Sequence, residues 1–120
     1  MSKPILLHVS GDLMLGSAVK AAADAAGLEQ RRALSWAAAT QQLAGLPAAV
    51  VLVDLDLAGF DGPAIVEATS GHVVGIYGPH VRTDLFAAAE AAGIEHRFTR
   101  GQIAGQGEAV LNRLCEDVAG

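Results

Sequence analysis

Apolar positions along the chain fall into two patterns that alternate from end to end, and together they predict the secondary structure. Short runs rich in apolar residues predict strands over Pro4–Val9, Leu28–Leu34, Ala49–Asp54, His72–Tyr77 and Glu95–Thr99. Apolar or small residues at helical spacing predict helices over Asp12–Ala26, Ser35–Ala44, Pro63–Thr69, Thr83–Ala92 and Ile103–Val118. Asp12, Ser35 and Asp61 are the expected N-caps, and Gly27 is the expected C-terminal stop of the first helix.

Five strands alternating with five helices predict a single α/β domain over residues 1–120. Its sheet should be parallel and doubly wound, because each parallel return needs a crossover helix. Ala49–Asp54 is the most continuous apolar run, so we place it at the centre of the sheet, buried on both faces. Leu28–Leu34 contains the charged stretch EQRR, which predicts an exposed edge strand with Arg31 and Arg32 in solvent.

Composition and charge narrow the class of protein. Apolar residues make up 52% of the chain and aromatic residues 4%, which favours a helix-rich domain with modest side chains. The net charge is −5 and no basic run is present, so nucleic acid is not an expected partner. No apolar stretch reaches the length of a membrane span, and nothing at the N-terminus resembles a signal peptide. Cys115 is the single cysteine, which suits a reducing compartment, so we expect a cytoplasmic protein without membrane contact.

Chemistry-bearing residues gather where the predicted strands end. In doubly wound sheets, ligands bind beyond the carboxyl ends of the strands. The residues expected there are Ser10, Gly11, Asp12, Asp54, Asp56, Tyr77, Gly78, His80 and Arg100. The histidines lack the spacing of a zinc site, and no phosphate-binding glycine motif is present. We therefore expect a polar pocket whose chemistry depends on Asp54 and its neighbours.

The stretch DLDLAGFDG, which begins at Asp54, resembles the signature of response-regulator receiver domains, and the likeness covers nearly the whole chain. The stretch AAGIEHRFTR, which ends at Arg100, is similar to the segment that leads into the receiver's invariant lysine. YGPHVRTDLFAAAEAAG resembles small stand-alone receiver-like proteins in which a histidine follows the fourth strand. The resemblance implies the flavodoxin-like receiver fold, with Asp54 at the phospho-accepting position and Arg100 at the lysine position.

The chain departs from the receiver pattern in three parts that receivers need for phosphorylation and at the aromatic switch position. Receivers carry two adjacent acids after the first strand, where this chain has Ser10 and Gly11 followed by Asp12. The receiver's Thr or Ser at the end of the fourth strand is Tyr77 here, and its lysine is Arg100. The aromatic switch position of receivers falls on Arg97.

These departures affect the residues that handle charge, so we interpret the chain as a pseudo-receiver. Only a weak Mg²⁺ site at Asp12 and Asp54 would remain. The planar guanidinium of Arg100 suits bidentate pairing with a carboxylate, so Asp54 is expected to be held in an ion pair. Asp56 is expected to cap the turn or face solvent. No enzymatic activity and no cofactor are expected, with Mg²⁺ needed only if phosphorylation survives.

Three functional hypotheses follow. The first is a stand-alone pseudo-receiver that signals by binding an unidentified protein, such as a histidine kinase or an output protein, or a second copy of itself. Its interaction face would follow the receiver pattern and carry Arg82, Phe86, Glu90, Arg97 and Phe98. The second is a phosphorelay receiver in which Asp54 accepts phosphate and Asp12 or Asp56 supplies the missing metal ligand. The third is a sensor that binds a small acidic ligand through Arg100 and His80.

Overall fold

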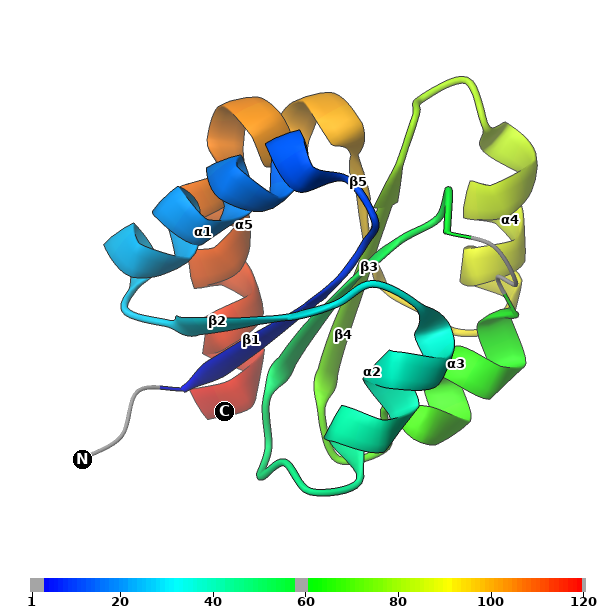
Figure 1. Cartoon of the computed structure of the whole chain (residues 1–120). Coiled ribbons are helices and arrows are strands. Elements are labelled where there is room, and N and C mark those ends of the chain that lie inside the picture. Colours follow the sequence, from blue (N-terminus) through cyan, green and yellow to red (C-terminus); the bar gives the residue numbers. More distant parts are fainter. Residues whose placement is uncertain (1–3, 58–60, 120) are drawn as a thin grey trace.

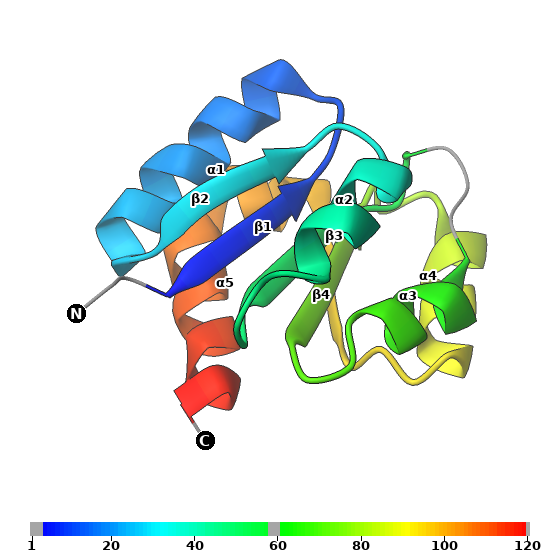
Figure 2. The same cartoon turned by 60° about the horizontal axis from the view of Figure 1, so that its bottom comes forward.

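A parallel sheet forms the centre of the computed structural model, which describes residues 4–57 and 61–119. In these ranges the strands are β1 (Ile5–Val9), β2 (Glu29–Ala33), β3 (Val50–Asp54), β4 (Val73–Gly78) and β5 (His96–Thr99). Their order is β2-β1-β3-β4-β5, and each neighbouring pair is parallel. Figure 2 shows β2, β1, β3 and β4 side by side. The predicted doubly wound sheet, with the third strand at its centre, is therefore confirmed.

Helices cover both faces of the sheet (Figure 1). α1 (Leu13–Ala26) and α5 (Arg100–Ala119) lie on one face. The other face carries α2 (Trp36–Leu43), α3 (Gly62–Ala68) and α4 (Thr83–Ala91). In the part of the chain that the structure describes, no helix is long and apolar enough to cross a membrane.

The two-sided burial explains why β3 is apolar at every position before Asp54. Side chains alternate between the faces of a strand, so Leu52 packs under α1 and α5, whereas Val51 and Val53 pack under α2, α3 and α4. The same alternation places Leu6 and His8 of β1 on the α1/α5 face. A strand that is covered on both sides needs apolar residues on both sides.

The predicted caps account for three of the helix starts. The side chains of Asp12, Ser35 and Asp61 accept hydrogen bonds from the backbone N–H groups of Leu15, Ala38 and Ala64, and so begin α1, α2 and α3. Gly27 ends α1 with a φ of 79°, a left-handed conformation that glycine adopts without steric cost. These four predictions are confirmed.

The start of α5 differs from the prediction, because the helix begins at Arg100 and not at Ile103. Thr99 and Gln102 form a reciprocal cap. The backbone N–H of Gln102 donates to Thr99 Oγ1 at 3.1 Å, and the backbone N–H of Thr99 donates to Gln102 Oε1 at 2.8 Å. This Thr-x-x-Gln capping box is visible in the sequence, and it brings Arg100 into the first turn of a helix.

Arg32 also differs from the prediction, since it is half-buried beneath α1 and does not lie in solvent. Its Nη2 donates to the backbone carbonyl oxygens of Ser10 at 3.4 Å and Asp12 at 3.2 Å. The guanidinium fits there because residue 16 is glycine. A Cβ on Gly16 would lie 2.6 Å from the guanidinium carbon of Arg32. Arg31, in contrast, is exposed and pairs with Glu29, as an edge residue should.

Gly16→Ala is expected to give no gain in stability, although alanine normally stabilises a helix interior over glycine by about 1 kcal/mol. The new methyl group would displace Arg32 and remove its two hydrogen bonds to the β1–α1 loop. The control is Gly105→Ala in α5, where a Cβ meets no atom within 4 Å; Gly105 directly precedes the kink at Gln106, and its φ is not in the left-handed region, so alanine can adopt it. Urea unfolding of both variants measures the difference. An equal gain in both would show that Arg32 does not hold this loop.

Candidate functional site

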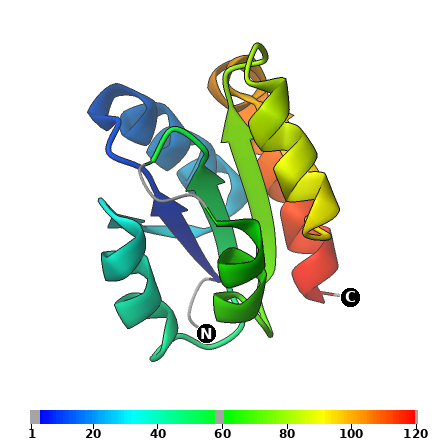
Figure 3. The ribbon, with the colours of Figure 1, turned by 90° about the vertical axis from the view of Figure 1, so that its right-hand side faces the viewer.

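The strands β1, β3 and β4 end at the same edge of the sheet, as the blue, green and yellow-green arrowheads of Figure 3 show. The loops after these strands therefore lie together, along with the beginnings of α1 and α5. Ser10, Asp12, Asp54, Asp56 and Arg100 all contact one another here, directly or through a shared partner. We call these five residues the acid cluster.

Asp54 is nearly enclosed, with 5% of its side chain exposed, and both of its carboxylate oxygens accept hydrogen bonds. The Ser10 hydroxyl donates to Oδ2 at 2.8 Å, and the backbone N–H of Asp56 donates to Oδ1 at 2.9 Å. A buried carboxylate is costly unless it is paired in this way. The hydrogen bonds hold the carboxylate in one orientation at the end of β3.

Asp12 performs two tasks, one with each carboxylate oxygen. Its Oδ1 accepts the capping hydrogen bond from the Leu15 N–H at 2.9 Å, and its Oδ2 forms an ion pair with Arg100 Nη2. Its own backbone N–H donates to Ser10 Oγ at 3.1 Å. The residue that caps α1 is thus also the carboxylate that binds Arg100 most closely.

Arg100 places its guanidinium among three carboxylates. Besides the contact with Asp12, Nη1 lies 3.9 Å from Asp56 Oδ2 and 4.0 Å from Asp54 Oδ2. The expected Arg100–Asp54 pair is therefore present only at the limit of ion-pair distance, and the main partner is Asp12. Asp56 is exposed, as predicted, but its carboxylate also faces the guanidinium.

The carboxylates of the acid cluster already face a cation that the protein itself supplies. Mg²⁺ requires oxygen ligands in near-octahedral geometry at about 2.0–2.1 Å. Within residues 4–57 and 61–119, no group of three or more metal-ligating side chains is positioned to hold a metal ion. The positive charge that faces the three carboxylates is supplied by the guanidinium of Arg100.

Tyr77 lies beside the acid cluster and is fully buried among the side chains under α1 and α5. Its hydroxyl and His8 Nε2 share a hydrogen bond of 2.7 Å, and His8 is also fully buried. Burial raises the pKa of Tyr77 well above its usual range, while the Ser10 hydroxyl opposes this effect and the Asp54 carboxylate adds to it. Burial also lowers the pKa of His8 to about 4, and the Arg32 cation acts in the same direction.

Sequence reasoning placed Tyr77 in the pocket but did not identify His8 or Arg32 as its neighbours. The signal for His8 was present, because a histidine interrupts the apolar run PILLHV at a position that shares a face with Leu6. The register pairs His8 with Arg32 across β1 and β2, and this pairing could not be derived from the pattern of the edge strand.

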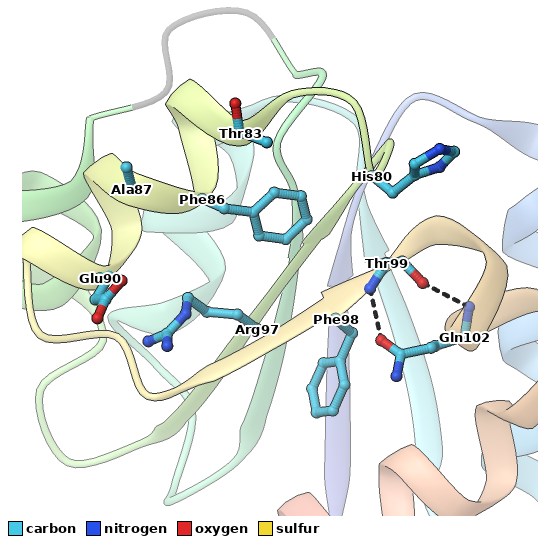
Figure 4. Close-up of a pocket in the computed structure, with 9 residues that line it drawn as sticks. All are labelled: His80, Thr83, Phe86, Ala87, Glu90, Arg97, Phe98, Thr99 and Gln102. Carbon is cyan, nitrogen blue, oxygen red and sulfur yellow. Dashed lines mark hydrogen bonds between the residues drawn. The ribbon is translucent and has the colours of Figure 1, made fainter.

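A groove of about 410 Å³ lies between α4 and β5 (Figure 4). Phe86 and Glu90 come from α4 and Arg97 from β5, with His80 beyond one end (Figure 4). The full lining is His80, Thr83, Phe86, Ala87, Glu90, Arg97, Phe98, Thr99 and Gln102. We call this the α4–β5 groove. Four of the five residues predicted for the interaction face line it: Phe86, Glu90, Arg97 and Phe98.

Some predicted residues lie elsewhere. His80 was expected beside Asp54 and Arg100; it lies at one end of the α4–β5 groove, past Thr99, with its ring directed away from Phe86 (Figure 4). Arg82 lies outside the groove lining and pairs with Asp84 in the exposed first turn of α4. Gly11 is exposed next to the acid cluster, whereas Gly78 is buried against Leu55. Gly59, in the DLDLAGFDG stretch, lies outside the described residues.

Comparisons with solved structures agree on the fold. The signal receiver domain of an HD domain-containing protein from Pseudomonas fluorescens Pf-5 matches with a TM-score of 0.84 and 17% identity, over 99% of this chain and 91% of that one. A response regulator from Thermotoga maritima matches with a TM-score of 0.77 and 18% identity, over 98% and 99% of the two chains. The beryllofluoride-activated NtrC4 receiver domain dimer matches with a TM-score of 0.77 and 18% identity, over 96% of each chain.

These likenesses, all below 20% identity, show that the chain has the flavodoxin-like fold of response-regulator receiver domains. No protein-family model and no curated protein matches the sequence. The predicted receiver fold is thus confirmed by the structure.

Proposed function

We propose that the chain is a receiver-type signalling module that binds a protein partner and does not depend on Mg²⁺-supported phosphorylation of Asp54. The observation that carries the proposal is the position of the Arg100 guanidinium among the carboxylates of Asp12, Asp54 and Asp56. Phosphoryl transfer depends on cations that position the phosphoryl group and neutralise its charge. Here the cation that faces the acids is part of the protein and already engages them.

The environment of Asp54 supports the same conclusion. Both carboxylate oxygens accept hydrogen bonds, and the side chain is nearly enclosed. Each oxygen keeps a lone pair, so the obstacle to a phosphodonor is access: only 5% of the side chain is exposed, and the Arg100 guanidinium lies beside it. The proposed function is therefore binding and not catalysis.

The α4–β5 groove is the surface that we assign to the partner. It combines the aromatic ring of Phe86 with one acidic and one basic side chain, Glu90 and Arg97, both exposed. An apolar contact next to two opposite charges suits a protein segment, since burial of the ring supplies affinity and the charges fix the register.

A test of the phosphorylation part uses a small phosphodonor, acetyl phosphate, with Mg²⁺ and intact-mass detection. We expect no phosphate on the wild-type protein and none on Asp54→Asn. Phosphate that appears on the wild type and disappears in Asp54→Asn would replace the proposal with the phosphorelay hypothesis.

A second test concerns the partner, using affinity capture from cells that express the protein. Any partner that is captured should be retained equally by the wild type and Asp54→Asn and lost in Arg97→Glu. Arg113→Glu is the matched control, because Arg113 is exposed on α5 and does not line the groove. Loss of the partner in Asp54→Asn, or equal loss in both arginine variants, would contradict the assignment.

A further inference from the structure

Tyr77 lies in the sheet between the acid cluster and the α4–β5 groove. In the register of the strands it pairs with Asp54 of β3 on one side and with Phe98 of β5 on the other. Tyr77 and Phe98 belong to the same buried cluster under α1 and α5, and Phe98 also lines the groove. A change at Asp54 that travels across the sheet must therefore move Tyr77 before it reaches Phe98.

His8 fixes Tyr77 from a third strand. The 2.7 Å hydrogen bond joins β1 to β4 through the interior, across β3, between two side chains with no exposed surface. Removal of one partner would leave the other with an unsatisfied polar group in an apolar setting, which costs about 1–3 kcal/mol. Any alternative position of the Tyr77 ring carries this penalty.

We propose that His8 is a positioning residue whose hydrogen bond to Tyr77 holds the row Asp54–Tyr77–Phe98 in one arrangement. The α4–β5 groove then keeps its shape whatever the charge of the acid cluster. This inference rests on the proposed function of the groove as the partner surface. It adds that His8 and Tyr77 keep the groove in one shape without phosphorylation. The position of Arg100 alone does not explain this.

A second route between the two sites runs through α5, and it can be distinguished from the first. Arg100 in the first turn of α5 contacts Asp54, and Gln102 two residues later lines the groove. A structural change transmitted through α5 should shift the backbone amide of Gln102. A change transmitted across the sheet should shift the backbone amide of Phe98. His8 acts only on the route across the sheet.

The test compares backbone amide chemical shifts by NMR when the charge at Asp54 is removed by Asp54→Asn. The substitution is made in four backgrounds: wild type, His8→Leu, Tyr77→Phe and Leu6→Val. Leu6 is fully buried on the same face of β1, two residues from His8, so Leu6→Val loosens the same core without touching the hydrogen bond. Tyr77→Phe keeps the ring and serves as the second variant should His8→Leu fail to fold.

In the wild-type and Leu6→Val backgrounds, we expect the Phe98 amide to shift no more than amides remote from the site. In the His8→Leu and Tyr77→Phe backgrounds, its shift should be several-fold larger, with Gln102 responding alike in all four. Equal Phe98 shifts in all backgrounds would overturn the assignment of His8. The NMR experiment uses no phosphodonor, so its outcome does not decide whether Asp54 is phosphorylated. The acetyl phosphate test, in turn, does not decide the role of His8.

Discussion

Tyr77→Ala is expected to lower the free energy of unfolding by about 3–5 kcal/mol, the usual cost of truncating a buried aromatic residue to alanine. The ring has no exposed surface and belongs, with Leu52, Phe98 and Leu111, to the core cluster under α1 and α5. The substitution also removes the hydrogen-bond partner of His8. Urea unfolding followed through the fluorescence of Trp36, the single tryptophan, measures the change.

Tyr77→Phe separates the two contributions, because it keeps the ring and loses only the hydroxyl. We expect a loss of about 1–3 kcal/mol, the cost of a buried polar group left without its partner. Val81→Ala is the control, since Val81 is 69% exposed and its truncation should change stability by less than about 0.5 kcal/mol. A Tyr77→Phe variant as stable as the wild type would show that the hydrogen bond to His8 does not hold the core together.

Acidification from pH 7 to pH 4 is expected to cost about 3 kcal/mol of stability through His8 alone. The pKa of His8 is about 4 in the folded protein, below the ordinary value of 6.5 that the unfolded chain has. Between these values the unfolded state binds the extra proton, so stability falls as the pH drops from about 6.5 to about 4. Below the folded pKa both states are protonated and the loss is complete.

His8→Leu removes this contribution while the acidic residues of the protein remain. Unfolding curves at several pH values should show that the free energy of unfolding of the variant, relative to that of the wild type, rises by about 3 kcal/mol between pH 7 and pH 4. Leu6→Val, which alters the same buried face of β1 without removing a titratable group, should differ from the wild type by a constant amount at every pH. A constant difference between His8→Leu and the wild type would mean that His8 titrates normally in the fold.

The fold was predictable because it depends on patterns that repeat along the chain. Apolar runs and helical spacing identify each element, and the fully apolar stretch before Asp54 identifies the central strand. Helix starts that rest on a single cap, such as those at Asp12 and Asp61, were equally readable. α5 starts three residues before the helical spacing predicts, because the reciprocal cap of Thr99 with Gln102 begins the helix ahead of its first apolar position, Ile103.

The site was only partly predictable, because its contacts depend on register and on side-chain direction. The carboxyl-edge rule brought Ser10, Asp54 and Arg100 together, but it could not say which acid Arg100 prefers. Asp12 is nearest because its capping role fixes it at the first turn of α1. Arg32 turns inward because Gly16 has no side chain, a relation between two elements that no single segment reveals.

We propose that the Arg100 guanidinium takes the place of an external cation and closes Asp54 to phosphoryl chemistry. The most direct measurement is thermal unfolding with and without Mg²⁺ and beryllofluoride, a mimic of aspartyl phosphate, for the wild type and Asp54→Asn. The NtrC4 receiver domain, which beryllofluoride activates, is the positive control. A ligand present at a hundred times its Kd would add about 2.7 kcal/mol, which shifts the melting temperature of a domain of this size by several degrees. We predict no shift for either form of this protein. A rise in melting temperature of the wild type that is absent in Asp54→Asn would contradict the account.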